Sequence, residues 1–272
     1  MIKILISLLF ATLLSAAQSH FSLTLSKQKV YMEEPVSATL TLTQDPGTAQ
    51  ITKMHFPTLK AKAFKIVPVT KAPENPNRRH YILLPQRPGS ITLPPQSIEI
   101  AHKDPATYRN IWRTLHTSPV TLTVLPLPTG IHATGDYRLK SHIDQHSVQA
   151  NTPVNLTVTI EGRGSLQGIQ ALHLPLQGPL IFESKAEIRS KIVNGSYLSS
   201  YTQRFSIVAN KDFTLPTLAW TYLNTQTGLT ETLTTPSYQV TVQAPPKKSH
   251  LLRDTLLIMA GLLGGVLLSS PL

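Results

Sequence analysis

Residues 35–43 read PVSATLTLT, and residues 153–160 read PVNLTVTI, 118 positions later in the chain. Both stretches alternate apolar and polar residues, which is the period of a β-strand with one buried face. The same offset of 118 relates five further apolar pairs: Phe21 and Leu139, Leu25 and Ile143, Val30 and Val148, Leu122 and Val240, and Val124 and Val242. Because the first and last strands repeat at one spacing, the sequence predicts two tandem copies of one β-domain.

A second repeat supports this interpretation. Residues 89–94 (GSITLP) are similar to residues 212–216 (DFTLP), this time at an offset of 122. In both, a turn leads into a short apolar strand that ends at a proline. About seven strands in each copy, separated by turns, are typical of an immunoglobulin-like β-sandwich. We therefore expect an all-β chain with one sandwich over residues 20–126 and a second over residues 135–243.

The N-terminus has the pattern of an export signal. Lys3 is the only charged residue among the first 26, residues 4–14 are predominantly apolar, and the small residues Ser15, Ala16 and Ala17 follow. A signal peptidase cleaves after small residues of this kind. The sequence predicts a signal peptide over residues 1–17.

The C-terminus contains a second apolar segment. Residues 255–272 carry no charge, and 18 residues in a helix reach about 27 Å, enough for a thin hydrocarbon core. We expect a transmembrane helix here, after a juxtamembrane spacer at 244–254. Gly261 and Gly265 have the spacing that lets membrane helices pack closely. No charged residue follows the segment, which is unusual for a stop-transfer anchor and is consistent with a longer natural chain.

Together, the two ends predict a single-pass protein of the inner (cytoplasmic) membrane with most of its chain in the periplasm. The chain contains no cysteine, so it can form no disulfides, although the periplasm would permit them. The basic residues that give the net charge of +11 are spread singly along the sequence apart from the pairs Arg78-Arg79 and Lys247-Lys248, and aromatic residues do not interleave with them as in a stacking surface. This pattern favours a solvated basic surface over a nucleic-acid site.

Few residues suggest catalysis or metal binding. Without cysteine, thiol nucleophiles and thiolate metal sites are excluded. His142 and His146 would lie about 13 Å apart on an extended strand, and Glu33 and Glu34 would point to opposite faces of one. Ser165 lacks the strand-turn-helix spacing of a nucleophile elbow. We expect no enzyme activity and no cofactor.

Two other groups of residues allow alternative interpretations. The Gly162-Arg163-Gly164 run is typical of a strand-end bulge where the chain turns, although such glycines also form phosphate-binding nests. Tyr108, Arg109 and Trp112 mix aromatic and basic side chains between two predicted strands, which suits either a contact patch or a tryptophan that covers the core from a loop. Arg163 is a fourth candidate contact residue.

Residues 151–166 (NTPVNLTVTIEGRGSL) resemble a motif of BatD-like proteins, the "oxygen tolerance" family of the Bacteroides aerotolerance operons, in which a strand ending in I-x-G-x-G-N-L introduces the second domain. The aromatic and proline pattern at Tyr201, Phe205, Phe213, Leu215-Pro216, Trp220 and Tyr222 is also similar to that family. Ser165 stands where the family usually has Asn, and the family's cytoplasmic extension is missing.

The resemblance implies a non-enzymatic, membrane-anchored periplasmic scaffold in an envelope complex concerned with stress or oxygen tolerance. It also implies partners among membrane proteins with von Willebrand A domains. The alternative is a periplasmic module that binds glycan or peptidoglycan, which requires a row of exposed aromatic residues on one sheet face. A hydrolase would require a cluster of acidic, basic or metal-binding side chains.

Overall fold

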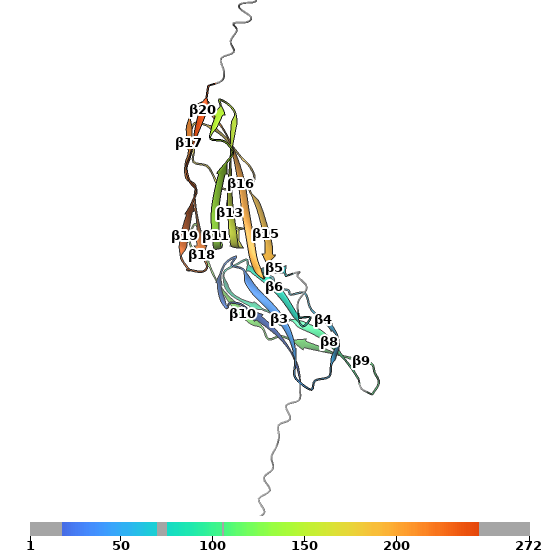
Figure 1. Cartoon of the computed structure of the whole chain (residues 1–272). Helices are drawn as coiled ribbons and strands as arrows, with labels where there is room; N and C mark the ends of the chain where they lie inside the picture. Colours follow the sequence, from blue (N-terminus) through green and yellow to red (C-terminus); the bar gives the residue numbers. More distant parts are fainter. Residues whose placement is uncertain (1–17, 70–74, 105, 245–272) are drawn as a thin grey trace, which may run out of the picture.

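The structure, a computed structural model, describes residues 18–69, 75–104 and 106–244 (Figure 1). This part of the chain folds into strands joined by turns and loops without any helix, so the all-β prediction is confirmed. It accordingly contains no helix long and apolar enough to cross a membrane. The predicted signal peptide, the membrane segment with Gly261 and Gly265, and the spacer beyond residue 244 lie outside the described residues.

The first ten strands form one unit with a core of its own. They are β1 (Ser19–Leu25), β2 (Lys29–Tyr31), β3 (Val36–Gln44), β4 (Ile51–His55), β5 (Phe64–Pro68), β6 (Arg78–Pro85), β7 (Gly89–Leu93), β8 (Ser97–Lys103), β9 (Asn110–His116) and β10 (Val120–Leu125). One sheet has the order β1-β3-β6-β5, and the opposite layer has the orders β2-β10-β7 and β4-β8-β9.

The opposite layer consists of two three-stranded sheets that follow one another along one hairpin, because β7 with β10 and β8 with β9 pair in a continuous register. Pro94 and Pro95 separate β7 from β8, and Pro119 lies between β9 and β10. Proline lacks the N–H that a strand ladder needs. The backbone N–H of Thr117 donates to the Gln96 carbonyl at 2.9 Å and keeps the two halves joined. The combined order is that of an immunoglobulin-like sandwich.

The remaining ten strands repeat much of this arrangement, although β18 and β19 join the sheet of β11. They are β11 (Thr134–Ile143), β12 (Ser147–Gln149), β13 (Pro153–Ser165), β14 (Leu180–Glu183), β15 (Glu187–Val193), β16 (Ser196–Val208), β17 (Phe213–Leu215), β18 (Ala219–Asn224), β19 (Thr230–Thr234) and β20 (Tyr238–Gln243). β11, β13 and β16 are neighbours, and β14 and β15 both pair with β16. β12, β20 and β17 form the opposite layer, while β18 pairs with β19 and with β11.

The strand register reproduces both sequence offsets. Val30 lies opposite Val124 in the parallel pair of β2 and β10, and Val148 lies opposite Val242 in the parallel pair of β12 and β20. Each residue of the second pair is 118 positions after its counterpart in the first. Ile91 lies opposite Leu122 in the first unit, and Phe213 lies opposite Val240 in the second. Phe213 is 122 positions after Ile91, and Val240 is 118 positions after Leu122. The duplication seen in the sequence is therefore also a duplication of strand pairing.

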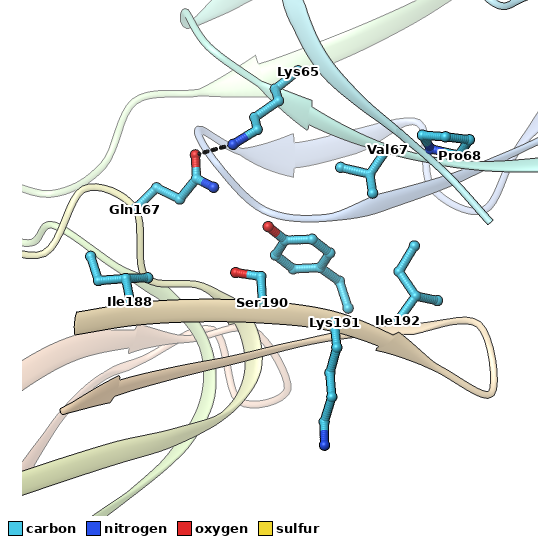
Figure 2. A pocket seen from close by; sticks show the side chains of 9 residues that line it. Lys65, Val67, Pro68, Gln167, Ile188, Ser190, Lys191 and Ile192 are labelled. Atoms are coloured by element: carbon cyan, nitrogen blue, oxygen red, sulfur yellow. Dashed lines mark hydrogen bonds between the residues drawn. The ribbon is translucent and has the colours of Figure 1, made fainter. Parts of the chain in front are cut away.

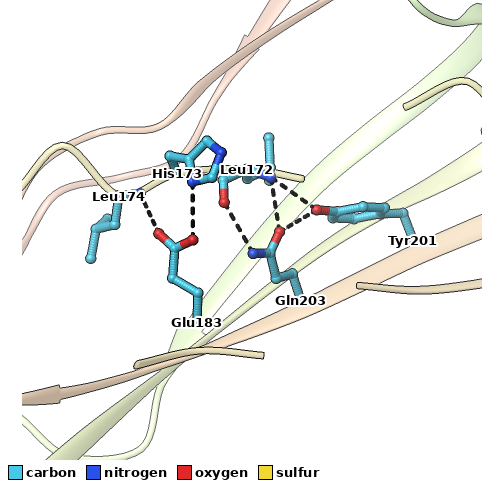
Figure 3. Close-up of polar contacts among 6 residues, drawn as sticks. All are labelled: Leu172, His173, Leu174, Glu183, Tyr201 and Gln203. Carbon is cyan, nitrogen blue, oxygen red and sulfur yellow. Dashed lines mark hydrogen bonds and ion pairs between the residues drawn. The ribbon is translucent and has the colours of Figure 1, made fainter. Parts of the chain in front are cut away.

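The two units differ in the segment that forms β4 in the first unit. Residues 166–179 of the second unit form no strand, and side chains hold this segment in place (Figure 3). The buried Gln203 amide accepts from the Leu172 N–H at 2.9 Å and donates to the Leu172 carbonyl at 3.0 Å. Glu183 accepts from His173 Nδ1 at 3.0 Å. The two Gln203 bonds satisfy backbone groups of Leu172 that a sheet ladder would otherwise satisfy.

Five short strands were not predicted from the sequence: β2, β4, β9, β12 and β19. Of the two interpretations of Trp112, the one in which it covers the core from a loop is wrong, because Trp112 lies in β9 with 46% of its surface exposed. The prediction that the chain turns sharply at Gly162 and Gly164 is also wrong. Strand β13 continues through both glycines to Ser165 and stays paired with β11. Asn194 and Gly195 have φ values of 49° and 73°, as the tight hairpin turn between β15 and β16 requires.

Candidate functional site

The glycines of the Gly162-Arg163-Gly164 run make room for Tyr137. Tyr137 lies opposite Gly162 across the β11–β13 pair, and a Cβ on Gly162 would lie 2.0 Å from the Asp136 carbonyl oxygen and 2.9 Å from the Tyr137 ring. A Cβ on Gly164 would lie 2.3 Å from the Tyr137 hydroxyl. The ring thus covers strand positions without side chains. This packing assigns the glycines a structural role.

Tyr137 is the centre of an aromatic cluster with Trp220 and Tyr222, at ring distances of 5.4 and 5.2 Å. Its hydroxyl donates to the carbonyls of Thr134 (2.8 Å) and Ser165 (3.0 Å). Burial raises the pKa of this hydroxyl well above its usual value, and the charge of Glu33 adds to the effect. Tyr137 therefore remains a protonated donor. Trp220 lies in the core of the second unit.

The two units meet at a small apolar contact. Tyr197 of β16 packs against Ile82 and Leu84, which are on the outer face of β6. Beside this contact runs a groove of about 710 Å³ between the edge strands β5 and β15 (Figure 2). Lys65 Nζ donates to Gln167 Oε1 across the groove at 2.9 Å.

Glu33 and Glu34, the adjacent carboxylates noted in the sequence, lie near the same junction. They do not form an acid–base pair. Glu34 is buried and accepts from Lys27 Nζ at 2.6 Å and from the Tyr31 N–H at 3.0 Å. Burial raises the pKa of the Glu33 carboxyl, and the Gly168 N–H and the Lys65 charge oppose this shift only in part. The buried Glu33 Oε2 has no partner within hydrogen-bonding geometry among the described residues. Glu34 therefore has a structural role in the first unit, and Glu33 has one at the junction between the units.

The hairpin of β8 and β9 carries three of the four predicted contact residues. Tyr108 is 76% exposed and Trp112 46% exposed, and Arg109 is also exposed. Strand β9, which contains Trp112, has two further exposed residues, Ile111 and Arg113. The sequence alone does not mark these two as contact residues. Figure 1 shows this hairpin projecting from the first unit at the end of the molecule opposite β20.

Side-chain contacts hold this hairpin in shape. Asp104 accepts from the Ala106 N–H at 2.9 Å and from the Thr107 hydroxyl at 2.7 Å, and its carbonyl accepts from the Tyr108 N–H at 2.8 Å. The Thr107 hydrogen bond is the largest of the effects that lower the pKa of Asp104. Trp112 stacks on His55 of β4 at a ring distance of 5.3 Å. The exposed aromatic surface is therefore held in a defined position.

The fourth contact candidate, Arg163, lies in the second unit and does not join this group. It lines a separate hollow of about 750 Å³ on the outer face of the sheet, with basic residues from β11 and β15. The described residues contain no group of three His, Cys, Asp or Glu side chains placed to hold a metal ion. His146 instead packs beside Tyr238.

A comparison with protein families gives a match over the first unit. The model described as "BatD DUF11 like domain" matches residues 23–124. Residues 23–124 form a BatD domain. The resemblance to BatD-like proteins is thereby confirmed, although the two motifs that suggested it, at residues 151–166 and 201–222, lie beyond the matched range. No curated protein sequence matches the chain.

Comparison with solved structures gives only distant likenesses. The E. coli adhesin FdeC is 12% identical over 84% of this chain and 66% of its own, with a TM-score of 0.22. The titin I9-I11 tandem is 11% identical over 84% and 66%, with a TM-score of 0.20. The Yersinia pseudotuberculosis adhesin InvE is 12% identical over 82% and 58%, with a TM-score of 0.23. This chain thus spans slightly less than two thirds of the FdeC and titin structures. TM-scores this low carry no argument about function.

Proposed function

We propose that this protein is a non-enzymatic scaffold of the cell envelope, which binds partner proteins through the β8–β9 hairpin of its BatD domain. The observation that carries the proposal is the exposure of Tyr108, Ile111 and Trp112 on one projecting hairpin. Exposed Trp and Tyr side chains with adjacent Arg residues are the side chains that contribute most to protein–protein binding energy. The stacking of Trp112 on His55 of β4 and the hydrogen bonds of Asp104 hold this hairpin in a defined position, which lowers the entropy lost on binding.

The proposed placement in the envelope combines sequence and structure. The predicted signal peptide at 1–17 would export the chain, and the predicted segment at 255–272 would anchor it in the inner membrane. The last described strand, β20, ends at the opposite end of the molecule from the β8–β9 hairpin (Figure 1). In an anchored protein the hairpin would therefore face away from the membrane, toward periplasmic parts of its partners. From the family resemblance, we propose that these partners include membrane proteins with von Willebrand A domains.

The test is co-purification of the full-length protein with such a membrane protein from detergent extracts. Four samples are compared: the wild type, the hairpin variant (Tyr108→Ala with Trp112→Ala), the β14 control (Leu180→Ala with Phe182→Ala), and the wild type at high salt. The control removes two side chains of similar exposure, 59% and 57%, from β14 of the second unit. Removal of a binding hot spot costs about 2 kcal/mol, which is roughly a 30-fold loss of affinity.

We expect the hairpin variant to lose the partner while the β14 control retains it. Circular dichroism and thermal unfolding should be unchanged in both variants, because all four side chains are exposed. Equal capture by the hairpin variant and the wild type would contradict the proposed role of the hairpin. A protease that cannot cross the inner membrane should digest the folded units only after the outer membrane is opened, which tests the periplasmic location.

The glycan-binding alternative is less well supported. It requires a row of exposed aromatic rings along one sheet face. Among the described residues, the strongly exposed large aromatic side chains are Tyr108, Trp112 and Phe182. Phe182 belongs to the second unit, so these three side chains form no such row. Binding to isolated cell-wall fractions that is lost in the hairpin variant would revive this alternative.

A further inference from the structure

The outer face of the second unit has a hollow lined with basic residues. It measures about 750 Å³ and lies over four neighbouring strands, β11, β13, β16 and β15. Four cationic side chains line it: Arg138, Arg163, Arg189 and Lys191. They come from three strands that are about 25 positions apart in the sequence, with Arg189 and Lys191 on the same strand, so the three groups come together only because of strand pairing.

The register arranges these side chains in two rows across the sheet. In one row, Arg163 lies opposite Leu198, and Leu198 lies opposite Lys191 on its other side. Neighbouring strands are about 4.8 Å apart, so the two cations flank Leu198 at a backbone separation of about 10 Å. Their long side chains can converge on one group above Leu198.

The second row is two residues further along each strand, about 7 Å away. There, Arg138 lies opposite Glu161, Glu161 lies opposite Ser200, and Ser200 lies opposite Arg189. Glu161 is paired with Lys140, and Arg189 with Glu187. With Asp136 opposite Arg163 in the first row, each row carries two cations and one carboxylate. The rows differ in their ion pairs, because no salt bridge among the described residues involves Arg163 or Lys191, whereas Glu161 and Arg189 are both paired.

Three of the four cations have no ion-pair partner within the described residues: Arg138, Arg163 and Lys191. Asp136 also lines the hollow and lies opposite Arg163, but no salt bridge joins them, and Asp136 accepts from Gln226 Nε2 at 3.2 Å. A guanidinium and an ammonium held on either side of an apolar floor favour an incoming oxyanion, because charge-assisted hydrogen bonds to Arg and Lys are short and strong.

We propose that this hollow binds a small ligand with a carboxylate or phosphate group, held between Arg163 and Lys191 above Leu198. Arg138, two strands from Leu198, takes a second anionic group of the same ligand. The site lies on the second unit, outside the matched BatD domain and away from the β8–β9 hairpin. It is thus independent of the proposed scaffold function.

Isothermal titration calorimetry of the full-length protein in a neutral detergent tests the proposal, in a buffer free of phosphate and carboxylate. One arm uses inorganic pyrophosphate, and the other uses tri-glutamate peptide. Each arm compares the wild type with Arg163→Gln, Lys191→Gln and the control Arg204→Glu. Arg204 is exposed on β16 in the same sheet, yet it does not line the hollow.

We expect at least one probe to bind, and its affinity to fall about tenfold or more in Arg163→Gln and in Lys191→Gln. The control should bind as the wild type does. Binding in one arm alone identifies the ligand chemistry as phosphate or carboxylate. Two results would overturn the proposal: no binding of either probe up to about 1 mM, or an equal loss of affinity in Arg204→Glu, which would indicate general attraction to a basic surface.

Discussion

Substitution of Gly162 by alanine tests the role of the glycine run most sharply. The added Cβ would lie 2.0 Å from the Asp136 carbonyl oxygen and 2.8 Å from Tyr137 Cα. Both atoms belong to the backbone of the paired strand β11, so a side-chain rotation cannot relieve the contact. The strands must move apart by about 1 Å, because real Cβ contacts shorter than 3.0 Å are essentially never seen.

The expected loss of stability has two parts. Overpacking a well-packed site costs about 1–3 kcal/mol. Separation of β11 from β13 also weakens about two ladder hydrogen bonds, at about 1 kcal/mol each. We therefore expect Gly162→Ala to lower the free energy of unfolding of the second unit by about 3–5 kcal/mol.

Urea unfolding followed by tryptophan fluorescence measures this change. Trp220 lies in the core beside Tyr137, whereas Trp112 is exposed in the first unit. A Trp112→Phe background leaves Trp220 as the only reporter. The control is Gly228→Ala, at a φ of 73° with no atom within 4 Å of the added Cβ. Only backbone strain applies there, so about 1–2 kcal/mol is expected. A loss for Gly162→Ala no greater than for the control would refute the reasoning.

Two further substitutions probe the second unit and the junction between the units. Gln203→Leu leaves the Leu172 carbonyl without its partner and weakens the support of residues 166–179, so we expect a loss of about 2 kcal/mol in urea unfolding, with faster proteolysis of that segment. Glu33 has a raised pKa in the folded protein, so its ionisation opposes folding above that pKa, and the penalty disappears as the pH falls to the unfolded value. Glu33→Gln should therefore raise the urea midpoint at pH 7 and leave it unchanged near pH 4. An equal effect at both pH values would show that the charge is not responsible.

The offset of 118 predicted most of the fold because it rests on buried alternation. Val36 to Leu42 alternates between buried and half-buried positions along β3, and the same pattern recurs in β13. Strand β9 was missed because six of its seven residues are exposed, so no alternation marks it. Its hairpin extends beyond the core, and strand pairing with β8 determines its structure.

The candidate sites depend on contacts between segments that are distant in sequence. Gly162 is 25 residues from Tyr137, and only the β11–β13 register shows that the ring requires the glycine. The basic hollow was missed for the same reason. Arg138, Arg163 and Lys191 are single charges in the sequence, and their convergence depends on the pairing of four strands. Composition alone marks Trp112 as a candidate contact residue, and only the structure shows that its side chain is exposed.

Engineered cysteine pairs test the central claim, that one sandwich with one strand register is present twice. The chain contains no cysteine, so each introduced pair is unambiguous. Val30 and Val124 are direct neighbours in the first unit, as are Val148 and Val242 in the second, at a strand spacing that permits a disulfide. Under mild oxidation, Val30→Cys with Val124→Cys and Val148→Cys with Val242→Cys should both cross-link within one chain, whereas Val30→Cys with Val242→Cys should not. Cross-linking of the exchanged pair, or of only one of the two matched pairs, would contradict the duplication.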